Sequence, residues 1–143
     1  MTLLNLVIDH LKAGALGFKA VEPIETLADL ETVMVARPAC FVLPATDDYL
    51  ATQEGTGLIN IEHTERFDVV VMVDAATRLS QRQDELRALV IAARERLFGW
   101  TPDREIWRPM VPEAGRLTGV GGGRASFLTR FRTVSRIRKT GVI

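Results

Sequence analysis

Residues 125–138 have the sequence ASFLTRFRTVSRIR, in which side chains of two kinds alternate. The odd positions carry Phe127, Thr129, Phe131, Thr133, Ser135 and Ile137, and the even positions carry Arg130, Arg132, Arg136 and Arg138, with Leu128 and Val134 as apolar exceptions. Successive side chains of a β-strand point to opposite faces of the sheet. The alternation therefore predicts a strand over 124–137 with one half-aromatic face and one face that carries a row of arginines.

Two interpretations of this arginine row are open from the sequence. Neighbours on one face of a strand lie roughly 6.6 Å apart, and two exposed charges at that distance repel by only about 0.6 kcal/mol in water. Burial of the same charges without partners costs far more. The row is either a solvated face of an antiparallel sheet or a face that meets a partner.

The same segment gives the chain a strong charge asymmetry. The last thirty residues contain no Asp or Glu and carry seven basic side chains: Arg116, Arg124, Arg130, Arg132, Arg136, Arg138 and Lys139. The whole chain has 18 basic and 18 acidic side chains, so residues 1–113 hold 11 basic groups against 18 acidic ones, a net charge of about −7. An acidic body with a basic C-terminal end suits head-to-tail association of copies or docking on an acidic surface.

Outward from this strand, the patterning predicts a hairpin and a long helix. A strand over 116–120 is expected to pair with 124–137 across the turn Gly121-Gly122-Gly123. The apolar run FDVVVMV at 67–73 is the strongest strand of the chain. A helix is predicted over 80–98, because its apolar residues recur every three or four positions and Gly99 supplies the C′ position.

The remaining elements complete the predicted fold. Helices are expected over 3–14 and 24–35, and strands over 18–21, 39–43, 58–63 and 66–73, with an edge strand over 106–111 and an exposed polar loop over 46–57. Helices alternate with strands early and strands dominate late. The prediction is a single α+β domain spanning 1–143, with a small mixed, mostly antiparallel sheet and helices packed on one face.

Several classes of function find no support in the motifs. The donors His10, His63 and Cys40 lack the spacing of a metal site, and the glycine cluster at 119–123 lacks the residues of a phosphate-binding loop. We therefore expect no catalytic, metal or cofactor site. No apolar run reaches the length of a membrane span and no secretory signal is recognisable, which predicts a protein made in a reducing cytosol with a buried, inert Cys40.

The candidate functional residues are accordingly those of an interface with other subunits or partners. They are the basic residues Arg116, Arg124, Arg130, Arg132, Arg136 and Arg138, the acidic residues Asp47, Asp48 and Glu54 of the predicted loop, and Trp107 of the predicted edge strand. Reversing Arg130 and Arg132 to Glu is expected to abolish association and to leave the monomer folded.

A set of segments, in a fixed order, resembles a known family. It comprises an amphipathic N-terminal helix, the strand Ala39-Cys40-Phe41-Val42-Leu43-Pro44, the segment Glu65-Arg66-Phe67-Asp68-Val69-Val70-Val71, the block Leu97-Phe98-Gly99-Trp100-Thr101-Pro102, and a glycine-rich region before an aromatic terminal strand. In this order the chain is similar, from about residue 3 to 137, to the tail terminator proteins of long-tailed bacteriophages and related tail-like particles.

The resemblance implies a structural protein rather than an enzyme. In that family six copies form a ring that caps the tail tube, stops its polymerisation and offers a surface to the head-side connector. It implies assembly in the host cytoplasm, a final place in the virion at the head-proximal end of the tail, and DNA passing through the ring. The implied partners are further copies of the chain, the major tail tube protein and the head–tail connector protein, with no membrane.

A small nucleic-acid-binding module is the alternative. Seven basic groups near the C-terminus could neutralise several phosphates, and the affinity would then fall steeply with salt concentration. No recognisable nucleic-acid motif accompanies them, and the body is acidic. A salt titration with duplex DNA separates the two interpretations, because a capping ring is expected to bind free DNA weakly.

Overall fold

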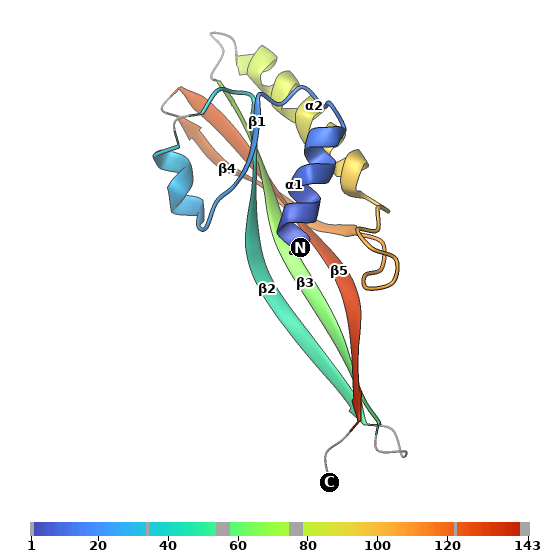
Figure 1. The fold of residues 1–143 in the computed structure, drawn as a ribbon. Helices are drawn as coiled ribbons and strands as arrows, with labels where there is room; N and C mark the ends of the chain where they lie inside the picture. Colours follow the sequence, from blue (N-terminus) through green and yellow to red (C-terminus); the bar gives the residue numbers. More distant parts are fainter. Residues whose placement is uncertain (1, 34, 54–57, 75–78, 122, 141–143) are drawn as a thin grey trace.

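The computed structural model describes residues 2–33, 35–53, 58–74, 79–121 and 123–140 (Figure 1). In chain order the elements are α1 (Leu3–Ala13), β1 (Ala20–Pro23), the 3-10 helix η1 (Leu27–Glu31), β2 (Ala39–Gln53), β3 (Leu58–Asp74), α2 (Leu79–Leu97), β4 (Val111–Gly121) and β5 (Arg124–Thr140). The strands form one sheet in the order β1-β2-β3-β5-β4, in which β1 runs parallel to β2 and the other neighbours are antiparallel. The predicted α+β class and the mixed, mostly antiparallel sheet are confirmed.

The centre of the sheet is the pairing of β3 with β5. Every residue of β3 is in register with one of β5, from Leu58 opposite Thr140 to Asp74 opposite Arg124, without a bulge. Residues paired directly across an antiparallel ladder share a face, so this register decides which side chains of β3 and β5 lie together. One consequence is the stack of Phe67 on Phe131, whose ring centroids lie 5.6 Å apart.

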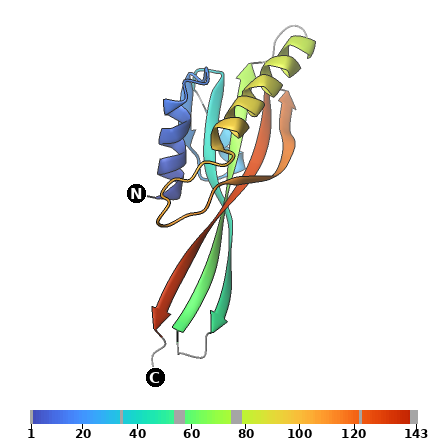
Figure 2. The same ribbon diagram turned by 90° about the vertical axis from the view of Figure 1, so that its right-hand side faces the viewer.

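Two apolar clusters lie on the two faces of the sheet. On one face Val69, Val71 and Val73 pack with α1 and α2. On the other face Val70 and Met72 pack with the region around η1. Both α-helices therefore cover the same face, as predicted, and the short η1 covers the other (Figure 2).

Cys40 lies in the cluster beneath the two α-helices. Its side chain is completely buried, and this burial raises the pKa of the thiol to about 12. The thiol therefore stays protonated near neutral pH, and the prediction of a buried Cys40 is confirmed.

The predicted second helix over 24–35 is wrong in its length and type. The segment after β1 first continues along the sheet, where the Ile24 amide donates to the carbonyl oxygen of Val42. The Asp29 carboxylate then accepts the amides of Glu25 and Thr26, which starts the single 3-10 helix. The β-branched residues around this helix favour extended backbone, which limits it to Leu27–Glu31.

The predicted loop over 46–57 is also wrong where it can be compared. β2 does not end at Pro44 but continues to Gln53, with a bulge between Pro44 and Asp47 that absorbs the proline. Residues 54–57 lie outside the described residues. The break predicted between 63 and 66 is likewise absent, because β3 runs from Leu58 to Asp74.

These long strands create an extension that we call the arm. It consists of residues 47–53 of β2, 58–65 of β3 and 133–140 of β5. The arm leaves the body of the protein as a three-stranded sheet that no helix covers on either face (Figures 1 and 2). We predicted a loop over 46–57 because its residues are polar. A strand that is exposed on both faces needs no alternating apolar pattern, so its sequence does not reveal it as a strand.

At the C-terminal side the predicted hairpin is confirmed and extended. β4 starts at Val111 rather than at 116, and its last residue, Gly121, pairs with Arg124. The edge strand predicted over 106–111 is wrong: Trp107 makes one isolated bridge to Ser135, and Pro109 interrupts the amide pattern. The Met110 backbone is instead bonded to Gly99 and Trp100, next to the C-terminus of α2.

We predict that replacing Phe131 by Ala lowers the free energy of unfolding by about 3–5 kcal/mol, since the ring is fully buried between the sheet and the helices. Phe98→Ala is the matched control, because Phe98 is 56% exposed. That control is expected to change stability by less than about 0.5 kcal/mol. Urea unfolding followed by circular dichroism measures both, and equal losses would contradict the assigned core.

A second prediction concerns His10, whose ring stacks on Trp100 with centroids 3.9 Å apart. Burial, and secondly the Arg96 guanidinium, lower the pKa of His10 below 6.5, against the opposing hydrogen bond to the Arg96 carbonyl oxygen. The unfolded chain then binds the proton more readily than the folded chain. Stability is therefore complete above pH 6.5 and declines as the pH falls through the lowered folded pKa.

Unfolding free energies between about pH 8 and pH 5 test this for the wild-type chain and for His10→Gln. The variant is expected to lose the part of the pH dependence that lies just below 6.5. Identical slopes in the two proteins would show that His10 does not carry it.

Candidate interaction surface

The structure divides the arginine row of β5 into two parts. The row lies on the face of the sheet opposite α1 and α2, because its members alternate with Phe127 and Phe131, which pack on the helix side. At the start of the strand, Arg124 donates to the backbone carbonyl oxygens of Leu30 and Glu31 at 2.6 and 2.8 Å. Arg124 therefore fastens η1 to the sheet, and its hydrogen bonds are made within the chain.

Arg130 forms the most enclosed ion pair of this face. It lies opposite Asp68 in the β3–β5 register and donates from Nε and an Nη to the two carboxylate oxygens at 2.8 and 3.1 Å. The Asp68 side chain is buried, and its hydrogen bonds raise the pKa of Arg130. A bidentate pair with one buried member has an internal structural role.

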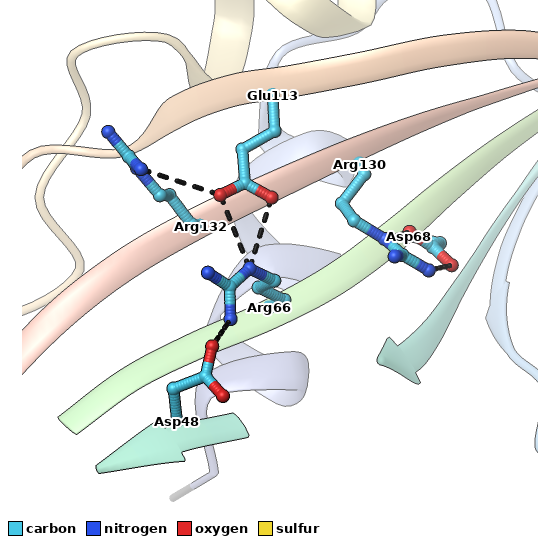
Figure 3. A network of polar contacts seen from close by, with 6 residues as sticks. All are labelled: Asp48, Arg66, Asp68, Glu113, Arg130 and Arg132. Carbon is cyan, nitrogen blue, oxygen red and sulfur yellow. Dashed lines mark hydrogen bonds and ion pairs between the residues drawn. The ribbon is translucent and has the colours of Figure 1, made fainter. Parts of the chain in front are cut away.

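Arg132 and Arg66 lie directly opposite each other, which would be unfavourable for two like charges without a counter-ion. Figure 3 shows how Glu113 of β4 lies between them, accepting from Arg66 at 3.1 Å and from Arg132 at 3.5 Å. Arg66 also donates to Asp48 of β2. This pair with Asp48, followed by Glu113, raises the pKa of Arg66 against the effect of desolvation.

The second part of the row lies on the arm. Arg136 and Arg138 are exposed, opposite Glu62 and Asn60 of β3, and within the described part of the chain neither makes an ion pair. Arg116, on β4, is exposed in the same way. Of the six arginines predicted as interface residues, three are thus used inside the chain and three point to solvent.

The acidic candidates Asp47 and Asp48 lie on β2 at the root of the arm rather than in a loop. Asp47 accepts from Nε2 of His63 at 3.1 Å, and the ring of His63 stacks on Tyr49 with centroids 4.4 Å apart. The other acidic candidate, Glu54, lies outside the described residues.

Trp107 is half-buried and packs against the core beneath the helices. Its indole N–H donates to Oε1 of Glu65 at 3.2 Å. The residue joins the segment before β4 to the root of the arm, so the structure gives it an internal contact and leaves its proposed interface role untested.

Sequence reasoning missed the apolar residues that the arm exposes. Tyr49 is 63% exposed, Leu50 66% and Ile137 45%. All three lie on the two outer strands of the arm. The sequence did contain one indication of this surface, the apolar pair Tyr49-Leu50 within a segment interpreted as a polar loop. Two neighbouring apolar residues are a weak indication on their own.

A second exposed feature lies at the other end of the molecule. An open groove of about 640 Å³ runs between α2 and β4, with Leu86 and Val90 on one side and Leu117 on the other. Among the described residues no group of His, Cys, Asp and Glu could hold a metal ion. None of the helices in the described ranges is long and apolar enough to cross a membrane.

Comparison with known proteins places this fold in a family. The sequence matches the family model described as "Phage tail terminator protein" over residues 2–141. A match over almost the whole chain defines a structural protein of phage tails. The chain belongs to the phage tail terminator family, and the resemblance noted from its motifs is confirmed.

A solved structure has the same fold. A chain of the structure titled "Virion of native gene transfer agent (GTA) particle" superposes with a TM-score of 0.60 at 18% sequence identity, covering 94% of this chain and 95% of that one. At this identity the likeness is one of fold. No curated protein matches the sequence.

We predict different effects for the two adjacent arginines of β5. Arg130→Ala leaves the carboxylate of Asp68, which is 4% exposed, without its counter-ion and is expected to cost about 2–3 kcal/mol of stability. Arg132→Ala removes a 3.5 Å contact of a half-exposed side chain and is expected to cost less than about 1 kcal/mol.

Chemical denaturation of the two variants measures the difference, and a larger loss for Arg132→Ala would contradict it. The same geometry affects the double reversal expected from the sequence. Arg130→Glu would place a second carboxylate beside Asp68, so that variant reports on folding as well as on association.

Proposed function

We propose that this protein forms a closed ring of six copies that caps the head-proximal end of the tail tube, ends tube polymerisation and joins the tail to the head connector. The observation that carries the proposal is the family match over residues 2–141. The partners are further copies of the chain, the major tail tube protein and the connector protein. The ring assembles in the host cytoplasm and ends in the virion.

The distribution of contacts supports a protein whose surfaces act in assembly. The body has two apolar clusters of its own. Beyond its root, where the segment around Trp107 contacts Val134 and Ser135, the arm has no helix on either face, and no described strand pairs with its outer edges (Figures 1 and 2). A three-stranded sheet without a covering layer is only marginally stable alone. The arm therefore has the geometry of an element that is completed by neighbouring molecules.

The nucleic-acid-binding alternative is weakened by the same contacts. Arg124, Arg130 and Arg132 make hydrogen bonds within the chain, which leaves Arg116, Arg136 and Arg138 as the exposed arginines of the basic segment that make no ion pair with a described residue. Any salt dependence of DNA binding is then expected to correspond to about four phosphates, for these three arginines and Lys139, rather than seven. Contact with DNA in the central passage of a ring is compatible with this smaller number.

The capping role is tested with tubes assembled from the tail tube protein of the same particle. We expect the added protein to halt tube growth and to appear as a ring on one end in negative-stain images, with native mass giving six copies. An unrelated protein of equal mass is the control for crowding. Tubes that elongate unchanged in the presence of the protein would contradict the role.

The alternative is tested separately by titrating the free protein with duplex DNA at several salt concentrations. Weak binding with a shallow salt dependence is expected for a capping ring. Tight binding whose affinity falls steeply with salt would favour the nucleic-acid module.

A further inference from the structure

The outer edge of β2 has a partner only in the body of the protein. β1 pairs with residues 39–42 of β2, and the last contact along this edge is the hydrogen bond from Ile24 to Val42. Beyond the bulge, Asp47–Gln53 pair with β3 in an uninterrupted register, while their other side faces no described strand. This edge presents a row of backbone groups that can pair with another chain.

The opposite side of the arm has a second open edge. β4 covers β5 from Arg124 to Arg132, and the segment before β4 adds a bridge at Ser135 and a hydrogen bond to Val134. From Arg136 to the end of β5, no described residue pairs with this edge. The arm therefore has one open edge on each side.

These two edges lack two of the usual protections against strand addition, a proline and a bulge, although both carry charged side chains. The outer strand β4 shows what protection looks like, because it contains Pro112 and two register shifts in eleven residues. The arm edges have neither a proline nor a register shift between Asp47 and Gln53 or between Arg136 and Thr140. The charges on these edges disfavour pairing with an edge of the same sign and leave pairing possible with an edge of the opposite sign.

The charges on the two edges are complementary. Asp47 and Asp48 lie on the β2 edge, where they contact His63 and Arg66 of their own chain and still have side chains that are 44% and 69% exposed. Arg136 and Arg138 are exposed on the β5 edge. Asp48, Arg136 and Arg138 point to the same face of the arm, since Asp48 is level with Val134 in the register. A β2 edge can therefore approach a β5 edge with opposite charges facing.

The exposed apolar side chains of the arm are on the same two strands. Tyr49 and Leu50 lie on β2, and Ile137 lies on β5. By the register, Tyr49 and Ile137 point to one face of the arm and Leu50 points to the other. Pairing of the two edges brings Tyr49 of one copy towards Ile137 of the next and removes part of their surface from water. Within one chain β2 and β5 both run antiparallel to β3 and are therefore parallel to each other. Two copies placed side by side in the same orientation then pair the β2 edge of one with the β5 edge of the other in parallel.

From these observations we propose that the arm is completed by a second copy of this chain. The edge of β2 at Asp47–Gln53 pairs, in parallel, with residues 136–140 of β5 of the neighbouring copy. Such an interface joins two different surfaces, so it repeats around a ring, and both edges of every arm are paired when the ring closes. The inference rests on the proposed function for the closure of the ring, and it specifies which surfaces join the copies.

Two charge-reversed proteins test the pairing. In Asp47→Lys/Asp48→Lys both edges are basic, and in Arg136→Glu/Arg138→Glu both are acidic. Each protein alone meets like charges at every junction and is expected to associate at least about tenfold more weakly than the wild-type chain. A mixture of the two has opposite charges at every junction when the copies alternate, which a ring of six permits, and is expected to recover association.

The measurements are sedimentation velocity and native mass, on each protein and on the equimolar mixture. Arg87→Glu/Arg104→Glu is the matched control, because both side chains are exposed and lie off the arm, and it is expected to associate like the wild-type chain. Thermal unfolding of each variant checks that the monomer is intact.

Amide hydrogen exchange of the wild-type protein provides a readout that is independent of variant folding. Amides at 47–53 and 136–138 are expected to become protected when copies associate. Rings that form without this protection, or that form equally well from either reversed protein, would overturn the inference and leave the capping role standing. Protection of the β2 edge only after tube protein is added would show that the tube protein occupies it.

The capping role fails by a different result. If copies associate through the two arm edges but the resulting assembly does not stop tube growth, the proposed function is contradicted and the pairing is supported.

Discussion

The structure depends on the pairing of β3 with β5, which run in register over the whole length of β3. Even the paired residues nearest in sequence, Asp74 and Arg124, are 50 residues apart. In the body, this ladder sets the two faces on which the apolar clusters form, with Val69 and Val71 on one side and Val70 and Met72 on the other. Farther along, the same ladder continues past the helices and forms the arm. Folded core and protruding surface are thus two ends of one pair of strands.

The basic side chains of β5 have different surroundings in the body and on the arm. Near the body the arginines of β5 meet carboxylates that other strands bring to the same face, Asp68 from β3 and Glu113 from β4. On the arm β4 no longer pairs with β5, and Arg136 and Arg138 are exposed to solvent. The result is a protein whose basic end is neutral where it folds and charged where it protrudes.

Much of the fold could be predicted from the sequence because its signals are local. The strand at 124–137, the long helix ending before Gly99, and the hairpin before Arg124 were predicted close to their observed positions. Prediction was wrong where the conformation of a segment depends on pairing with a strand that is distant in the sequence. Pro44 reads as a strand end but lies in a bulge of β2, and the polar stretch after it reads as a loop although β3 holds it as a strand.

The candidate surface shows the same division. The sequence by itself determined the alternation of arginines and aromatics on β5, the acidic character of the body, the positions of the main caps and turns, and enough motifs to identify the family. Only the tertiary structure decided that Arg124, Arg130 and Arg132 are bound within the chain, while Arg136 and Arg138 share an open arm with Asp47 and Asp48. The reason is physical: the direction of a side chain follows from the backbone of its own strand, whereas its partners come from strands far away in the sequence.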